Sequence, residues 1–157
     1  MTRVLLVCTG NTCRSPLAAA LLRRELEQRG IEDVVVESAG TGAWEGIPAS
    51  EGSYLVGIEH DLDLSAHRSR LLTRELVEGA DLILTMGRSH AARAEALGGT
   101  GRTFLLGEFA GRDGPAAEVR DPFGGELSQY REAFRELAEL VGVAADRLAE
   151  GRRASDR

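Results

Sequence analysis

Apolar residues along this chain follow two patterns that alternate from one end to the other. Short continuous apolar runs, typical of strands buried on both faces, lie at residues 4–7, 34–36, 81–86 and 102–106. Between them are longer amphipathic stretches. This alternation predicts an α/β fold, in which parallel strands are joined by right-handed helical crossovers.

The amphipathic stretches predict five helices. They cover residues 17–29, residues 48–57, a segment that begins after Thr73, a segment from Ser89 to Leu97, and residues 127–148. Thr73 and Ser89 are the expected N-caps, and Gly30 and Gly98 the expected stops. The ligand of such a fold lies at the carboxyl ends of the strands.

Composition narrows the class of protein. The chain has 157 residues, of which 43% are hydrophobic, so we expect one domain over residues 1–150, followed by a mobile polar tail at residues 151–157. No apolar run is long enough to span a membrane, and the start is too short for a signal peptide, which predicts a cytoplasmic protein. The net charge of −6 argues against nucleic-acid binding. Two cysteines five residues apart and three scattered histidines indicate neither a disulfide framework nor a zinc site.

The candidate chemistry lies in residues 8–15, CTGNTCRS, between the first predicted strand and the first predicted helix. Backbone N–H groups converge there and the helix dipole is positive, which favours an anion. Arg14 can bind two phosphate oxygens, and Cys8 beneath the phosphorus can act as a thiolate nucleophile. Cys8 can also be a small buried hydrophobe. Gly10 and Asn11, which suit a tight turn, favour the functional interpretation.

Residues 8–15, followed by Pro16, resemble the phosphate-binding loop of the low-molecular-weight protein tyrosine phosphatases. Three further segments agree in family order: residues 37–41 (ESAGT), 66–70 (AHRSR) and 121–125 (DPFGG). The resemblance covers residues 4–148. It implies a single three-layer domain with a four-stranded parallel sheet, and the phosphate-binding loop at the carboxyl end of the first strand.

The resemblance also implies roles for individual residues. Cys8 is the nucleophile, Arg14 binds the phosphate, and Asp121 is the general acid. The remaining phosphate-loop residues are Thr9, Gly10, Asn11, Thr12, Cys13 and Ser15. Ser15 donates to the Cys8 thiolate, while Ser38 and His67 support the loop through Asn11.

Two of these assignments have alternatives. Asp121-Pro122 before two glycines is also an ordinary turn, and Asp113 and Glu118 are nearby carboxylates. Cys13 is either a core residue or a redox partner that forms a disulfide with Cys8 and protects it from irreversible oxidation.

The pocket residues indicate the substrate. Thr12 and Phe123 resemble the bacterial protein-arginine phosphatase branch, whereas Trp44 is typical of the tyrosine-directed branch, although it can also stack on a guanidinium. Ala49 and Gly87 depart from the usual family pattern. We therefore predict a protein phosphatase that prefers phosphoarginine, with phosphotyrosine as the alternative.

Other interpretations remain open at this stage. They are an arsenate reductase, for which further cysteines are missing, and a phosphate-binding or redox-sensing module, which would not need Asp121. We expect no metal or organic cofactor, because Arg14 and the loop amides supply the electrostatics. The expected partners are phosphorylated proteins, with neither nucleic acid nor membrane, and a monomer is favoured.

Overall fold

The structure is a computed structural model that describes residues 1–155. In this part of the chain four parallel strands form one sheet in the order β2-β1-β3-β4. The strands are β1 (Thr2–Cys8), β2 (Val34–Gly40), β3 (Leu82–Thr85) and β4 (Thr103–Leu105). The predicted α/β fold with a four-stranded parallel sheet is confirmed.

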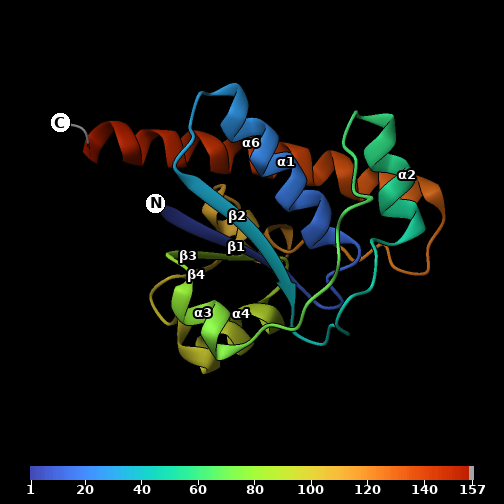
Figure 1. Cartoon of the computed structure of the whole chain (residues 1–157), viewed down its shortest axis with the longest axis horizontal. Helices are drawn as coiled ribbons and strands as arrows, with labels where there is room; N and C mark the ends of the chain where they lie inside the picture. Colours follow the sequence, from blue (N-terminus) through green and yellow to red (C-terminus); the bar gives the residue numbers. More distant parts are fainter. Residues whose placement is uncertain (156–157) are drawn as a thin grey trace.

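Helices cover both faces of this sheet (Figure 1). They are α1 (Arg14–Gln28), α2 (Glu51–Glu59), α3 (Arg74–Gly79), α4 (Arg88–Ala94), the π-helical turn η1 (Glu95–Gly99), α5 (Leu106–Phe109), the 3₁₀ turn η2 (Gly114–Ala117) and α6 (Leu127–Ser155). Helices α1 and α6 lie on one face, with α2 beyond them, and α3 and α4 lie on the other. The domain therefore has three layers.

Strand β1 has a hydrophobic core on each side. Leu6 packs with the apolar faces of α1 and α6, and its neighbour Leu5 packs with residues of α3 and β3. Successive side chains of a strand point to opposite faces, so a strand covered on both sides must be apolar at every position. This explains the continuous apolar run at residues 4–7.

The central position of β1 also locates the functional loop. Within the sheet, β2 lies on one side of β1, and β3 and β4 lie on its other side. A crevice forms outside the carboxyl ends of strands where the order reverses in this way. The segment after Cys8 lies at this point.

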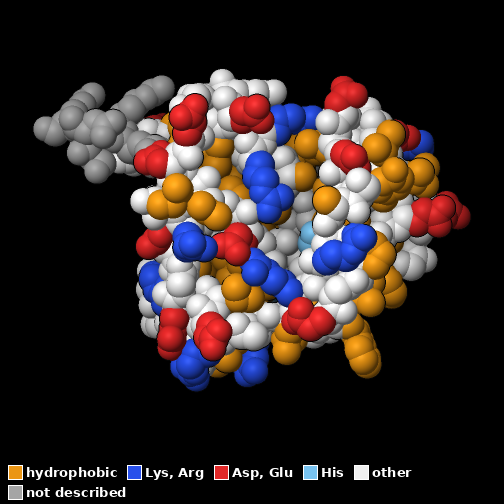
Figure 2. Space-filling model, viewed as in Figure 1, with side chains coloured by type: hydrophobic (Ala, Val, Ile, Leu, Met, Phe, Trp, Pro, Cys, Tyr) orange, Lys and Arg blue, Asp and Glu red, His pale blue; other side chains and the backbone are white. Residues whose placement is uncertain are grey.

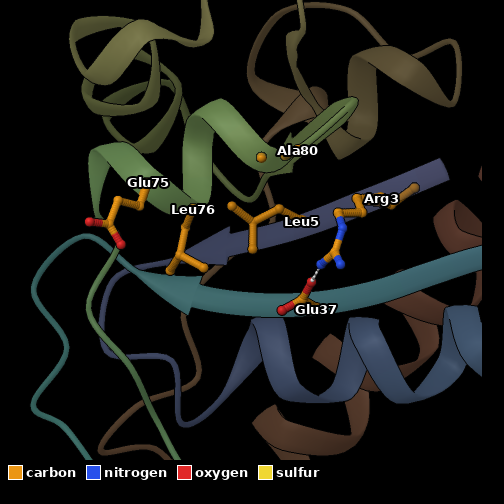
Figure 3. Close-up of a pocket in the computed structure, with 8 residues that line it drawn as sticks. Arg3, Leu5, Glu37, Glu75, Leu76 and Ala80 are labelled. Carbon is orange, nitrogen blue, oxygen red and sulfur yellow. Dashed lines mark hydrogen bonds and ion pairs between the residues drawn. The ribbon is translucent and has the colours of Figure 1, made fainter. Parts of the chain in front are cut away.

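Strand β2 is an edge strand. Ion pairs of its side chains link it to neighbouring parts of the chain. Glu37 accepts a hydrogen bond from Arg3 of β1 at 2.8 Å, as Figure 3 shows, and one from Arg70 at 2.6 Å. The Arg70 hydrogen bond is the main reason that the pKa of Glu37 lies below its ordinary value. Beside this pair, a small cavity of about 120 Å³ lies against α3.

Several predicted boundaries differ in the structure. Helix α1 begins at Arg14, before the predicted start, because the loop closes directly into its first turn. Helix α4 begins one residue before Ser89, with Gly87 as the N-cap and no side-chain cap, so the Ser89 cap was wrong. The Thr73 cap is confirmed, since its hydroxyl accepts from the Leu76 N–H at 3.2 Å.

The last helix is longer than predicted. Helix α6 runs to Ser155, so residues 151–155 of the predicted tail are helical. Residues 156–157 lie outside the described residues. The polar sequence after residue 150 lacks the apolar stripe that predicts a helix, but it contains no proline that would end one.

Candidate active site

Cys8 ends β1 and lies at the bottom of the loop. Its side chain is buried, and its Sγ lies 2.9 Å from the hydroxyl of Ser15 in the first turn of α1. A hydroxyl that donates to sulfur stabilises a thiolate, and the positive end of the α1 dipole acts in the same direction. This contact joins the strand end to the helix start across the loop.

Asn11 holds the middle of the loop. It has a φ of 56°, a left-handed conformation that asparagine tolerates better than most residues. Its buried amide nitrogen donates to the hydroxyls of Ser15 at 2.8 Å and Ser38 at 2.9 Å. Its amide oxygen accepts from the backbone N–H of Arg70 at 3.0 Å. The Asn11 side chain therefore joins the loop to three other parts of the chain, the start of α1, β2 and the segment around Arg70.

The end of β2 closes the other side of the loop. The Thr41 and Gly42 N–H groups donate to the carbonyls of Cys8 and Thr9, both at 2.9 Å. A Cβ on Gly40 would collide with the Thr9 carbonyl, so only glycine permits this approach.

His67 supports the loop from the α1 face. Its Nε2 lies 2.7 Å from the carbonyl of Asn11 and must donate, because a carbonyl only accepts. Burial lowers the pKa of His67, although this hydrogen bond opposes the effect, and nearby arginines lower the pKa further. These arginines, Arg23, Arg68 and Arg70, line a hollow of about 410 Å³. Figure 2 shows basic side chains gathered around a depression on this face.

Arg14 presents an unpaired donor toward the loop. Its Nη1 donates to the carbonyl of Val119 at 2.9 Å, which fixes the plane of the guanidinium. Among residues 1–155 its Nη2 has two long contacts, each at 3.5 Å, with Thr9 Oγ1 and Asp121 Oδ2. Its Nε is buried and has no hydrogen-bond partner within the described part of the chain. A buried unpaired donor is costly, so the fork of Nε and Nη2 is suited to an oxyanion.

Asp121 lies at the mouth of this site. The loop encloses a cavity of about 170 Å³, lined by Cys8, Thr9, Gly10, Thr12, Cys13, Arg14, Asp121 and Phe123. The Asp121 side chain is 46% exposed, and its Oδ1 accepts from the Phe123 N–H at 3.0 Å. Asp113 and Glu118 are not among the lining residues. Of the three carboxylates considered from the sequence, Asp121 therefore has the placement of a general acid.

The sequence pattern of the family described as low molecular weight phosphotyrosine protein phosphatase matches residues 3–154. The chain belongs to this family. It is 42% identical to a protein-arginine-phosphatase of Geobacillus stearothermophilus, covering 94% of both chains. It is 40% identical to a probable low molecular weight protein-tyrosine-phosphatase, EpsP, of Ralstonia solanacearum, covering 92% of this chain and 94% of the relative.

Solved structures agree. The YwlE arginine phosphatase of Geobacillus stearothermophilus superimposes with a TM-score of 0.87 at 38% identity, covering 98% of this chain and 97% of that chain. A YwlE variant in which serine replaces cysteine, with its active-site serine phosphorylated, superimposes with a TM-score of 0.89 at 37% identity, covering 97% and 99%.

The second cysteine of this phosphatase has its own polar surroundings. The Cys13 thiol donates to the Ser50 hydroxyl at 3.2 Å and lies 3.8 Å from the hydroxyl of Tyr130. Burial, followed by the Cys13 hydrogen bond, raises the pKa of Tyr130. Cys13 and Cys8 are both free and both line the cavity. Their predicted pairing on oxidation stays a prediction.

Trp44 is the predicted site residue that the structure does not bring to the cavity. Its side chain is 81% exposed and is not among those that line the cavity. The backbone here is fixed by hydrogen bonds: the Trp44 carbonyl accepts from the Ser69 hydroxyl, and Ser69 also bonds the backbone of Ile47. These bonds hold the loop after β2 against the 66–70 segment. Phe123, 74% exposed, is the aromatic ring at the cavity mouth.

Sequence reasoning missed several residues at the phosphatase site. Val119 supplies a carbonyl to Arg14, Ser50 and Tyr130 contact Cys13, and His90 contacts Thr9 at 2.8 Å. None of these residues stands in a sequence pattern that marks a site, because their roles depend on contacts between distant segments.

Within the described residues, no group of three or more His, Cys, Asp or Glu side chains is placed to hold a metal ion. No helix in that part of the chain combines the length and apolar character needed to cross a membrane.

Proposed function

We propose that this phosphatase hydrolyses phosphoarginine in proteins through a phosphocysteine intermediate. The observation that carries the proposal is the buried, unpaired Arg14 Nε in a residue that lines the same cavity as Cys8 and Asp121. Nucleophile, anion ligand and proton donor therefore face one space of phosphate size.

In the first step the Cys8 thiolate attacks phosphorus. The S–P bond forms while the bond from phosphorus to the guanidine nitrogen breaks, and protonated Asp121 gives its proton to that nitrogen. Arg14 Nε and Nη2, with the loop N–H groups, bind the equatorial oxygens and stabilise their charge in the transition state.

In the second step a water molecule replaces the departed arginine. Asp121, now a carboxylate, takes a proton from the water, whose oxygen attacks phosphorus while the S–P bond breaks. The electron pair returns to Cys8 as a thiolate, which the Ser15 hydroxyl at 2.9 Å stabilises. Phosphate then leaves, with Asp121 protonated for the next cycle. No metal or organic cofactor enters either step.

Two observations support phosphoarginine as the substrate. Thr12, small and polar, lines the cavity and leaves room for a forked guanidinium. Among similar proteins, the Geobacillus stearothermophilus relative at 42% identity is a protein-arginine-phosphatase.

Phosphotyrosine is the second candidate, favoured by Phe123 at the cavity mouth and by the EpsP relative at 40% identity.

The choice between the two substrates is tested by measuring kcat/KM on two peptides of one sequence, one with phosphoarginine and one with phosphotyrosine. We expect the phosphoarginine peptide to be the better substrate. A higher kcat/KM on the phosphotyrosine peptide would reverse the assignment.

A phosphate-binding or redox-sensing module is the non-enzymatic candidate. Such a module would need the loop but not a carboxylate at its mouth, so the position of Asp121 argues for an enzyme. The monomeric state, the cytoplasmic location and the absence of nucleic-acid binding stay predictions.

A further inference from the structure

His90 is a buried histidine behind the phosphate loop that the proposed chemistry does not use. It lies on α4, on the opposite face of the sheet from His67, and is 5% exposed. Its Nε2 is 2.8 Å from Thr9 Oγ1, the first side chain of the loop after Cys8. Thr9 Oγ1 in turn lies 3.5 Å from Arg14 Nη2. A chain of polar contacts thus runs from α4 to the phosphate fork.

The roles of the atoms in this chain follow from chemistry. Arg14 only donates, so Thr9 Oγ1 must offer it a lone pair. If the Thr9 hydroxyl donates its proton to His90 Nε2, the proton points away from Arg14. A lone pair of Oγ1 can then accept from Arg14 Nη2. Because burial and then Arg14 lower the pKa of His90 to about 4, its ring is neutral near pH 7 and has one nitrogen that accepts.

The surroundings favour Nε2 as this acceptor. Nδ1 is buried without a hydrogen-bond partner among the described residues. A Cβ placed on Gly87 would lie 3.5 Å from His90 Nδ1 and 3.0 Å from Glu118 Oε2. A carboxylate on the Nδ1 side favours a proton there. Near Arg14 the carboxylate of Asp121 acts in the opposite direction to the cation, but Arg14 has the larger effect on the pKa of His90 and favours a lone pair at Nε2.

We propose that His90 is a positioning residue for phosphoryl transfer, which holds the Thr9 hydroxyl by accepting its proton at Nε2 and so keeps Arg14 Nη2 directed at the phosphate. The proposal rests on the proposed function only in that Arg14 binds a phosphoryl group. Without the Thr9 contact, the nearest alternative partner of Nη2 is Asp121, also at 3.5 Å. A tighter Arg14–Asp121 pair would withdraw both groups from the reaction.

Three His90 variants separate this role from packing. In His90→Gln the amide reaches the former position of Nε2 and its oxygen can accept from Thr9. In His90→Asn the amide reaches only the position of Nδ1, and His90→Leu has no polar atom. We expect kcat on para-nitrophenyl phosphate to fall by up to roughly ten-fold in the Leu and Asn variants, the effect of one hydrogen bond between neutral groups. The Gln variant should keep most of the activity, with KM changing less than kcat.

A double-mutant cycle with Thr9→Val tests the coupling directly. If His90 acts through Thr9, the His90→Leu/Thr9→Val protein should be no slower than Thr9→Val alone. Losses that multiply, or a Gln variant as slow as the Leu variant, would overturn the proposal. Urea denaturation of each variant, read by circular dichroism, shows whether the loss of rate exceeds what an unfolded fraction explains.

The tautomer gives a spectroscopic readout that does not depend on turnover. Long-range ¹H–¹⁵N correlation of the His90 ring near pH 7 should show a protonated Nδ1 and an unprotonated Nε2. The reverse tautomer would overturn the role of Nε2 as an acceptor.

The assays also distinguish the two proposals. Para-nitrophenyl phosphate tests transfer to Cys8 whatever the natural substrate is, so hydrolysis of this ester with no activity on phosphoarginine refutes only the substrate. If the protein hydrolyses neither compound, the coupling is measured on the Kd of inorganic phosphate. Absence of His90–Thr9 coupling there would overturn the positioning role as well.

Discussion

The carboxylate of Asp121 lies 3.5 Å from the guanidinium of Arg14, although the two residues come from opposite halves of the chain. Arg14 opens α1, and Asp121 follows the turn η2 on the way to α6. The contact places an acid at the edge of the phosphate fork. A carboxyl group in this position lies beside the group that binds the phosphate, where it can protonate the atom that leaves phosphorus.

Replacing this acid should slow the reaction according to the leaving group. Asp121→Asn should lower kcat by about 10²–10⁴ on phosphoarginine or phenyl phosphate, the usual contribution of general acid catalysis. The loss should be much smaller on para-nitrophenyl phosphate, whose leaving group needs little protonation. Asp113→Asn, which alters a carboxylate outside the cavity lining, is the matched control. A larger loss in that control would mean that Asp113 is the acid.

Removing the nucleophile should separate binding from turnover. Cys8→Ser should lose several orders of magnitude in kcat, because a serine hydroxyl is a weak nucleophile at its ordinary pKa. Arg14 and the loop amides are unchanged, so isothermal titration should still detect inorganic phosphate. Substantial turnover in this variant would refute Cys8 as the nucleophile.

Oxidation should link the two cysteines of the cavity. Peroxide should inactivate the enzyme, and a thiol reductant should restore it through a Cys8–Cys13 disulfide. Peptide mapping by mass spectrometry should find the crosslink. In Cys13→Ser, activity measured relative to the untreated variant should not return after reduction. Full recovery in that variant would show that Cys13 does not protect Cys8.

Thr12 should set the preference between substrates. Thr12→Ile narrows the cavity beside the leaving group and should change the phosphoarginine to phosphotyrosine ratio of kcat/KM by roughly ten- to a hundred-fold in favour of phosphotyrosine, the usual effect of one pocket wall. Thr12→Ser keeps the hydroxyl and should leave the ratio near that of the wild type. Trp44→Ala should affect both substrates less than Thr12→Ile does, because Trp44 lies outside the cavity lining. An unchanged ratio in Thr12→Ile would remove the argument for arginine.

Burial of His90 should make stability depend on pH. Its pKa is about 4 in the native protein and 6.5 ordinarily, so between these values the unfolded chain binds more protons. The contribution of His90 to the free energy of unfolding should therefore be fully present above about pH 6.5. As the pH falls toward 4, the free energy of unfolding should decline by up to about 3 kcal/mol. Arg14 opposes protonation, while Asp121 and Glu118 favour it. Urea denaturation at pH 7.5 and 5 should show a smaller decline for His90→Gln; equal declines would mean that His90 does not titrate in this range.

The sequence predicted the parts of the protein that depend on local patterns. The apolar run at residues 4–7 indicates a strand covered on both faces, and both cores confirm it. The spacing of Cys8 and Arg14 predicts that both side chains face one anion-binding loop, and in the structure both line one cavity. Family motifs added Asp121, which no local pattern distinguishes from a turn.

The tertiary structure decided what depends on contacts between distant segments. Ser89 was expected to cap α4, but Gly87 is its N-cap, because capping is set by backbone conformation and not by residue type alone. Trp44 was expected at the cavity, but its side chain is exposed and does not line it, while its backbone bonds the 66–70 segment. His90 carried no signal in the sequence. Its proximity to Thr9 arises because α4 follows β3, the strand beside β1, so the start of α4 lies at the same sheet edge as the phosphate loop. A sequence specifies which groups are present, whereas the distances that give them chemistry exist only once the sheet has brought its strand ends together.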